Sequence, residues 1–209
     1  MDGIAVSTAT LLSRPAKNQP VLTMALCVAA ILFHVMPESG RELFYFDPGQ
    51  LRMGNLGGLV FSHWLHVDWP HLTWNVAALA LLGGMLERQS RALYCASLVA
   101  GTVAVDVLLL SPLSTVERYC GLSGVLNAVL GCLLYVMWLR TRSRIVIAVA
   151  ALALSKITVE MVYQQSLFTE IAWPPYSAAH LAGVLAAVIL CVIVSWSLSI
   201  QGRIARSAG

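Results

Sequence analysis

Charged residues are scarce in this sequence, which has 209 residues, 11% of them Asp, Glu, Lys or Arg and 58% hydrophobic. Its mean hydropathy of +0.78 is one that ordinary water-soluble domains do not reach. The net charge is only +3, and the basic residues are scattered between apolar runs, so there is no continuous basic stripe to bind a nucleic acid. The composition predicts a protein whose main solvent is lipid.

Paired metal-ligand and disulfide spacings are also lacking. Of the five cysteines, four lie inside apolar runs and Cys120 stands at the edge of one. This pattern fits neither a zinc site nor a disulfide framework. We therefore expect no metal and no nucleotide or redox cofactor.

Long apolar runs are what the sequence does contain. A helix that crosses a bilayer needs roughly 20 residues, and the run at 20–36 is followed by no small-residue cleavage pattern, so we expect it to stay as a helix and not to be removed as a signal peptide. We expect an all-α membrane protein with one six-helix domain at 20–201, a short cytoplasmic leader at 1–19 and a cytoplasmic tail at 202–209. The six apolar runs are 20–36, 71–86, 92–112, 121–139, 145–163 and 177–200.

The positive charges divide unevenly between the two ends of these runs. Cytoplasmic loops carry the excess of Lys and Arg, so the larger group predicts that both termini are cytoplasmic. The long loop at 37–70 then faces outward, and its Trp, Phe and Tyr residues predict that it lies in the membrane interface. On one side are Arg14, Lys17, Arg88, Arg91, Arg140, Arg142, Arg144, Arg203 and Arg206, and on the other are Arg41, Arg52 and Arg118.

A serine and a histidine open two of the expected outer helix ends. Ser123 stands in the string Gly121, Leu122, Ser123, Gly124 at the start of the fourth run, and His180 begins the sixth. A histidine inside an apolar segment is a functional candidate, and opposite a serine it suggests a nucleophile and its base. The glycines would admit a substrate backbone and leave amides free for an oxyanion.

Small residues offer a purely structural explanation of the same strings. Gly124, Ala128 and Cys132 recur every four residues, as do Ala179, Gly183 and Ala187, and such stripes suit close helix packing. The two stripes would also let the fourth and sixth helices touch, which the chemistry requires. No aspartate near His180 offers itself as a third member, so we expect a dyad.

The second run begins with further polar groups. His71 and Asn75 are one turn apart on a single helical face, where they could donate to a developing oxyanion. For His63 and His66, interfacial capping and anchoring of the loop are the preferred interpretation.

The Gly-Leu-Ser-Gly string, the later Ala-His-x-x-Gly and the His-x4-His-x3-Asn pattern together resemble the rhomboid family of intramembrane serine proteases over all six runs. The resemblance implies that Ser123 is the nucleophile and His180 the base. It implies that His71, Asn75 and the Ser123 amide form the oxyanion hole and that His66 holds the first loop in place. Gly83 and Glu87 match a structural pattern of the family.

A closer resemblance is to the rhombosortase branch. It is carried by His63-Trp-Leu-His66, by Ser111-Pro112 with the segment 119–126, and by Lys156 with Glu160. The resemblance implies a bacterial inner-membrane protease, open to the periplasmic side, that cleaves single-span proteins near a Gly-Gly motif in their C-terminal tails.

Two other functions remain open. Asn127 departs from the family, which often has an aromatic or histidine there, so a silent rhomboid-like protein that binds transmembrane clients is one alternative. Lys156 and Glu160 are one turn apart and are expected to pair structurally, with a gate role also possible, whereas Asp106 has no evident partner. A small transporter that uses these three charges as a relay is the second alternative.

Overall fold

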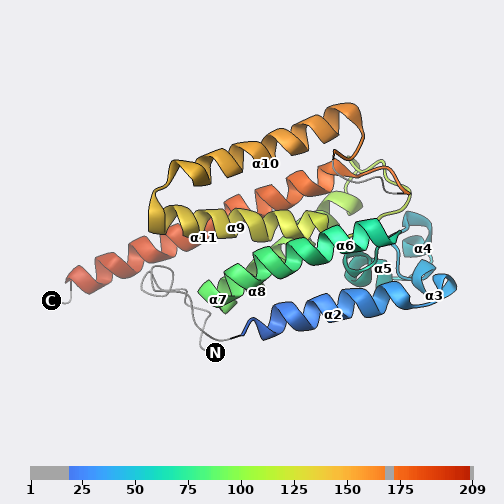
Figure 1. Cartoon of the computed structure of the whole chain (residues 1–209), viewed down its shortest axis with the longest axis horizontal. Coiled ribbons are helices and arrows are strands. Elements are labelled where there is room, and N and C mark those ends of the chain that lie inside the picture. Colours follow the sequence, from blue (N-terminus) through green and yellow to red (C-terminus); the bar gives the residue numbers. More distant parts are fainter. Residues whose placement is uncertain (1–18, 168–171, 208–209) are drawn as a thin grey trace.

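The computed structural model describes residues 19–167 and 172–207, with the backbone alone from residue 201 onward, and within these limits it is built from helices (Figure 1). Residues 1–18 of the expected leader and the last two residues of the expected tail lie outside this description. In the described part, extended pairing is confined to one bridge between Phe46 and Tyr119. The elements are α2 (Val21–Val35), α3 (Glu38–Glu42), α4 (Pro48–Arg52), α5 (Gly57–Phe61), η1 (Ser62–Trp64), α6 (Trp69–Ala78), η2 (Leu79–Gly83), α7 (Gly84–Gln89), α8 (Arg91–Leu110), α9 (Ser123–Thr141), α10 (Arg144–Tyr163) and α11 (Ser177–Ser207).

Four of these helices are long and apolar enough to cross a membrane: α8, α9, α10 and residues 177–200 of α11. A fifth, α2, is apolar but has only 15 residues. The expected second span is divided into α6, the π-helical turn η2 and α7, which follow one another without a break over 69–89. The all-helical architecture and the apolar helices are those of a multi-pass membrane protein.

Most helix ends lie close to the limits expected from hydropathy, because capping residues stand beside the apolar runs. Side chains of Asp68, Ser90 and Ser143 accept hydrogen bonds from first-turn amides of α6, α8 and α10. Two helices end on left-handed residues, Arg142 after α9 and Gln164 after α10. The exception is α11, which runs seven residues beyond the expected end at 200.

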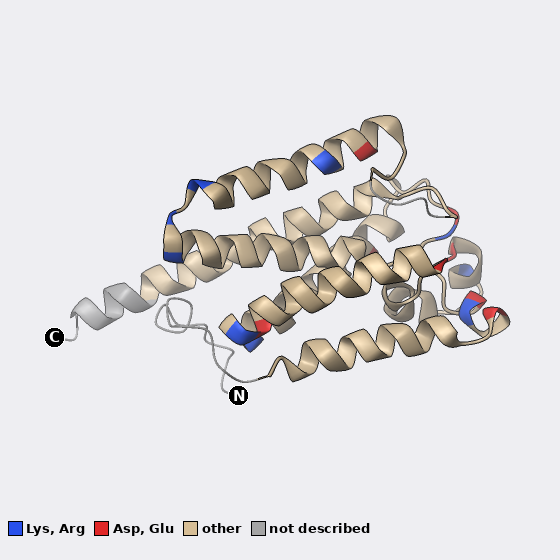
Figure 2. Cartoon of the chain, viewed as in Figure 1, with Lys and Arg blue, Asp and Glu red and all other residues tan. Residues whose placement is uncertain are grey.

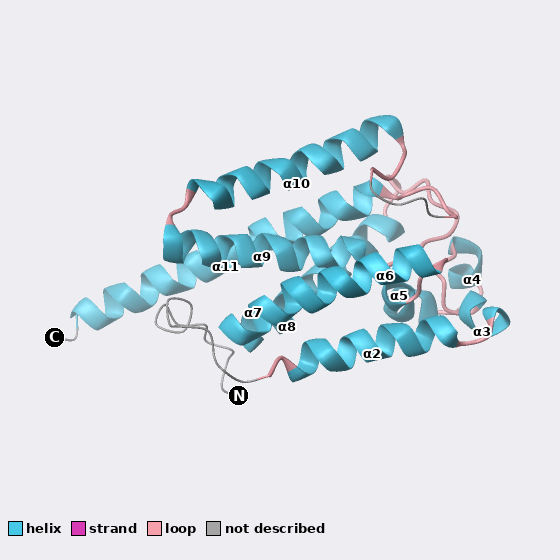
Figure 3. Ribbon diagram, in the orientation of Figure 1, coloured by secondary structure: helices cyan, strands magenta, loops and turns pink. Residues whose placement is uncertain are grey.

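The loops lie at the two ends of the helices, and the segment between α2 and α6 folds into short helices at one end (Figure 3). Most of the described Arg residues expected to be cytoplasmic lie at the opposite end, as Figure 2 shows for those near α7 and between α9 and α10. Arg14 and Lys17 are outside the description, and the side chains of Arg203 and Arg206 are not described.

The contact between α9 and α11 is the most extensive in the bundle, and α8 packs against both helices. Gly124 and Gly183 make this possible: a Cβ atom on Gly183 would overlap the carbonyl of Gly124, and one on Gly124 would lie 3.0 Å from the carbonyl oxygen of Ala179. The two helix backbones approach so closely here that neither position has room for a side chain. The two small-residue stripes thus bring the helices together as expected. By contrast, α10 packs sparsely and stands apart in Figure 1.

Glu87, near the C-terminal end of the segment at 69–89, binds the N-terminal end of α2. Its carboxylate accepts hydrogen bonds from the amides of Leu22 and Thr23, at 3.1 and 2.8 Å, and from the Thr23 hydroxyl. Pro20, at the N-cap of α2, provides no side-chain cap, so Glu87 does this from a different helix. Gly83 lets α2 and α8 approach, because a Cβ there would lie 2.8 Å from the hydroxyl oxygen of Tyr94.

Candidate active site

Ser123 is the first residue of α9, and the segment before it is held in a fixed position. The Gly121 amide donates to the Ser62 carbonyl at 2.9 Å, and the Tyr119 hydroxyl donates to the Gly121 carbonyl at 3.0 Å. Gly121 has φ +124°, and a Cβ on it would lie 2.6 Å from the His71 ring. Glycine is therefore required here both for its backbone angle and for the space it leaves to His71.

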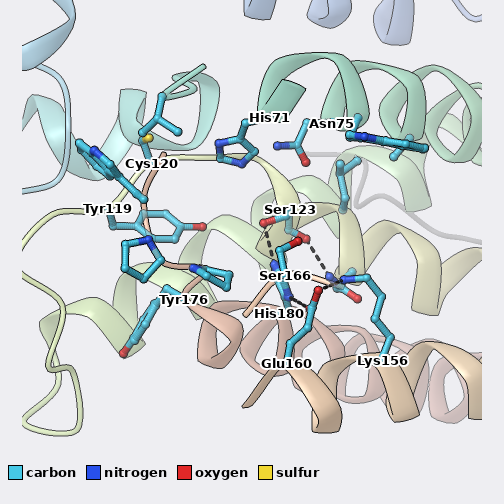
Figure 4. Close-up of a pocket in the computed structure, with 18 of the residues that line it drawn as sticks. His71, Asn75, Tyr119, Cys120, Ser123, Lys156, Glu160, Ser166, Tyr176 and His180 are labelled. Atoms are coloured by element: carbon cyan, nitrogen blue, oxygen red, sulfur yellow. Dashed lines mark hydrogen bonds and ion pairs between the residues drawn. The ribbon is translucent and has the colours of Figure 1, made fainter. Parts of the chain in front are cut away.

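His180 lies in the first turn of α11 and meets Ser123 across the α9–α11 contact. Its Nε2 is 2.8 Å from the Ser123 Oγ, and its side chain is 12% exposed (Figure 4). This distance is within the range needed for a base to take a hydroxyl proton. The helix contact through Gly124 and Gly183 is what brings the two side chains to the same depth.

The other ring nitrogen of His180 faces a carboxylate. His180 Nδ1 lies 3.4 Å from Oε2 of Glu160, which comes from the last turn of α10. The second oxygen of Glu160, Oε1, is 2.7 Å from Lys156 Nζ and accepts a hydrogen bond from the Leu167 amide at 3.2 Å. The expected Lys156–Glu160 pair is thus present, and it stands beside His180, where the sequence had suggested no third member.

His71 and Asn75 lie on the opposite side of Ser123 from His180 and Glu160 (Figure 4). Asn75 Nδ2 and His71 Nδ1 are buried and have no hydrogen-bond partner within the described part of the chain. The amides of Ser123 and Gly124 precede the first intrahelical bond of α9, from the Leu126 amide to the Leu122 carbonyl. Unpaired donors at a helix N-terminus form a region that favours negative charge.

These groups line a cavity of about 300 Å³. Its walls come from α6, the segment before α9, the N-terminal part of α9, the C-terminal part of α10, and the segment before α11 with the first turn of that helix. The segment before α11 contributes residues 173–176. It is anchored by two ring contacts, Trp173 against Tyr45 and Tyr176 against Tyr119. Asn127 also lines the cavity and donates from Nδ2 to the Ser123 carbonyl at 2.8 Å.

The two loop histidines, His63 and His66, are buried inside the protein. His63 is fully buried, and its Nε2 is 3.0 Å from Oδ1 of Asp106, the partner that the sequence did not reveal. His66 is also fully buried, and its carbonyl accepts a hydrogen bond from Arg41 at 3.1 Å. Burial, together with the neighbouring His71 and His34, lowers the pKa of His66 well below its ordinary value. A neutral His66 therefore fills the space between the loop and α6.

The Cys120 thiol and the Tyr119 hydroxyl, in the loop before α9, both have raised pKa values. Burial raises the pKa of the Cys120 thiol to about 12 and raises the pKa of Tyr119 well above its ordinary value. Neither group is ionised at neutral pH. Their contribution to the cavity is shape and, for Tyr119, the hydrogen bond that fixes Gly121.

The sequence predicted that Ser123 and His180 would meet and that His71 and Asn75 share one helical face. It missed the contact of Glu160 with His180, the pairing of Asp106 with His63, and the wall at 173–176. Of these features, only Glu160 and Lys156 could have been found from the sequence. Charged side chains in an apolar helix are costly, so a pair of them one turn apart indicates a structural or functional role. In the described part, no group of three or more His, Cys, Asp or Glu residues could hold a metal ion.

Comparison with known proteins gives a family but no individual relative. The family described as Rhomboid domain matches residues 53–197, which begin before η1 and end within α11 and thus include every residue of the cavity. No curated protein matches the chain with significant similarity. Because the match extends over more than half of the sequence and contains the whole candidate site, the chain belongs to the Rhomboid domain family.

Proposed function

We propose that this protein is an intramembrane serine endopeptidase in which Ser123 is the nucleophile and His180 the general base. The observation that carries the proposal is the 2.8 Å distance between Ser123 Oγ and His180 Nε2. It lies inside a cavity whose opposite wall presents polar atoms of His71 and Asn75 that have no partner among the described residues. Members of the Rhomboid domain family are generally intramembrane serine proteases, which agrees with this assignment.

The proposed reaction has two stages, acylation of Ser123 and release of the acyl group. Ser123 Oγ attacks the scissile carbonyl carbon while its proton passes to His180 Nε2. Negative charge forms on the carbonyl oxygen, where the amides of Ser123 and Gly124 and the side chains of His71 and Asn75 would stabilise it. His180 returns the proton to the leaving amine, and the C–N bond breaks. Water, deprotonated by His180, then releases the acyl group and restores the serine.

The same residues support an outward-facing site in a six-span protein. Ser123 and His180 lie at the outer end of α9 and α11 if the Arg-rich end is cytoplasmic. The six spans are α2, the segment at 69–89, α8, α9, α10 and α11. The short helices between α2 and α6 would then lie in the interface, and the bacterial inner membrane, with both termini cytoplasmic, is the proposed location.

Single-span membrane proteins ending in a Gly-Gly motif, an apolar helix and basic residues are the proposed substrates. The bulky side chains of Trp173, Tyr176 and Tyr119 line the cavity, which favours a substrate backbone without side chains near the serine. A second cavity of about 420 Å³, apolar and bordered by α9, α10 and α11, adjoins the first at Asn127 and offers space for an apolar segment.

A reporter with such a tail tests the proposal. Wild-type protein and Ser123→Ala are co-expressed with the tagged reporter, and removal of the tail is measured by immunoblot. We expect removal by the wild type and none by Ser123→Ala, since the nucleophile is lost. Cleavage by the purified Ser123→Ala protein would refute the role of Ser123.

Failure to react with a fluorophosphonate would instead favour a silent binder of transmembrane clients. Reaction with the fluorophosphonate but an uncut reporter would retain the protease and reject the Gly-Gly tail. The transporter alternative draws no support from its three charges, because Asp106 pairs with His63, and Lys156 pairs with Glu160.

A further inference from the structure

Two polar atoms at the site face each other. His180 Nδ1 and Glu160 Oε2 are 3.4 Å apart, both are buried, and neither makes a hydrogen bond to any other group in the described part of the chain. The separation exceeds an ordinary hydrogen bond by a few tenths of an ångström, and such contacts in substrate-free proteases commonly shorten when substrate binds.

Glu160 is held so that this oxygen remains available. The carboxylate is 1% exposed, and a buried charge in a membrane helix is unfavourable by several kcal/mol unless it is compensated. Lys156 Nζ and the Leu167 amide both bind Oε1, at 2.7 and 3.2 Å. They stabilise the charge and fix the side chain, and they leave Oε2 directed at His180 (Figure 4).

The orientation has a chemical consequence for the histidine. A neutral imidazole carries one proton, and the hydrogen bond made by one nitrogen decides which nitrogen holds it. With a carboxylate at Nδ1, the proton resides on Nδ1, and the lone pair of Nε2 is directed at the Ser123 hydroxyl. The opposite tautomer would put N–H against Ser123 and could not accept its proton.

We propose that Glu160 is a positioning residue that holds His180 in the tautomer able to take the proton of Ser123. The inference rests on the proposed protease function, and it extends the Ser123–His180 dyad to a third group supplied by α10. When Ser123 attacks, its proton moves to Nε2, the imidazolium is balanced by the Glu160 carboxylate, and the same proton leaves with the amine. Glu160 itself stays ionised throughout.

A purely structural ion pair makes different predictions. If Glu160 served only to neutralise Lys156, then Lys156→Met and Glu160→Gln would damage the protein alike, since each removes one partner. If Glu160 positions His180, Glu160→Gln removes the carboxylate that fixes the tautomer, whereas Lys156→Met keeps it. The larger loss of turnover then belongs to Glu160→Gln.

Steady-state cleavage by purified protein measures this difference. We expect Glu160→Gln to lower kcat by at least about 30-fold, with KM changed less than about threefold, because the loss is of proton transfer and not of substrate binding. Glu160→Asp should recover part of the loss, to within about tenfold of wild type, since a carboxylate is restored. Glu117→Gln is the matched control, because the same change is made on an exposed residue of the loop before α9.

Misfolding is separated from mispositioning by a double variant. Glu160→Gln leaves Lys156 without its carboxylate, so Lys156→Met with Glu160→Gln removes both charges together. We expect the double variant to elute as folded protein and to keep the low kcat of Glu160→Gln. A kcat within about threefold of wild type in the folded double variant would overturn the proposal.

The tautomer can be read without any substrate. In protein labelled with ¹⁵N-histidine at mildly alkaline pH, the His180 signals, identified by their loss in His180→Asn, should report the Nδ1–H tautomer and should change in Glu160→Gln. An Nε2–H tautomer in the wild type would overturn the proposal. An Nδ1–H tautomer that depends on Glu160, in a protein that cleaves no reporter, would leave the positioning role standing and reject the protease function.

Discussion

Gly183→Ala is the substitution whose effect the structure defines most sharply. The added Cβ would overlap the carbonyl of Gly124 and lie 3.2 Å from the amide nitrogen of Ala128. Ordinary contacts of carbon with such atoms are about 3.5 Å, so α9 and α11 must move apart by roughly 1 Å or more. Because His180 precedes Gly183 by one turn and Ser123 precedes Gly124 by one residue, this movement directly lengthens the 2.8 Å contact.

The expected magnitude follows from that displacement. A 1 Å misplacement of reacting groups lowers the rate about 100-fold, and forcing a methyl group into packed backbone destabilises a protein by about 1–3 kcal/mol. We therefore expect Gly183→Ala to lower the rate of fluorophosphonate labelling at Ser123 about 100-fold and to lower the melting temperature in detergent. Both are measured on the same purified sample.

Two alanine variants control for packing and for the substitution itself. A Cβ on Gly84 would make only an ordinary 3.7 Å contact with Pro20, so Gly84→Ala should leave both readouts near wild type. A Cβ on Gly131 would lie 2.5 Å from the Cβ of Ala187, deeper in the same interface, so Gly131→Ala should lower the melting temperature with a smaller effect on labelling. Labelling of Gly183→Ala at the wild-type rate would contradict the argument.

Three further expectations concern the surroundings of the site. Gly121→Ala should abolish most cleavage while the fold survives, because its Cβ would displace the His71 ring and because φ +124° disfavours alanine. Cleavage at the wild-type rate by a folded Gly121→Ala protein would contradict this expectation. Asp106→Asn should lower the free energy of unfolding by about 1–3 kcal/mol, because it weakens the hydrogen bond to buried His63. Thermal melting measures this change, and an unchanged melting temperature would argue against that hydrogen bond. The last expectation concerns a variant that retains Cys120 as its single cysteine. Its raised pKa of about 12 leaves roughly one thiol in a thousand ionised at pH 9, against about half for an ordinary thiol, so reaction with iodoacetamide should be slow until the chain is denatured. Rapid reaction in the native state would show an accessible, ordinary thiol.

Hydropathy predicted the positions of the long helices because the bilayer allows few alternatives for an apolar run. It could not predict the π-helical turn at Leu79–Gly83, which divides the second run without changing its composition. The small-residue stripes on α9 and α11 predicted that Ser123 and His180 would meet, since glycine and alanine at four-residue spacing are informative about helix contacts.

The contacts of Glu160 and Asp106 depend on how each helix is rotated about its axis. Glu160 was expected to pair with Lys156 one turn away, which is a local relation, but its approach to His180 requires α10 and α11 to be set in register. Asp106 on α8 meets His63 from η1, across 43 residues of sequence. Spacing within one segment carries no information about such partners.

The π-helical turn in the second segment has a consequence for the two ends of that helix. His71 and Asn75 face the cavity, whereas Glu87, further along the same segment, faces the start of α2. Each residue added to or removed from a helix rotates everything beyond it by about 100°. The wider turn at Leu79–Gly83 therefore changes the direction in which the later side chains point. It allows one continuous helix to present His71 and Asn75 to the cavity at one end and Glu87 to α2 at the other.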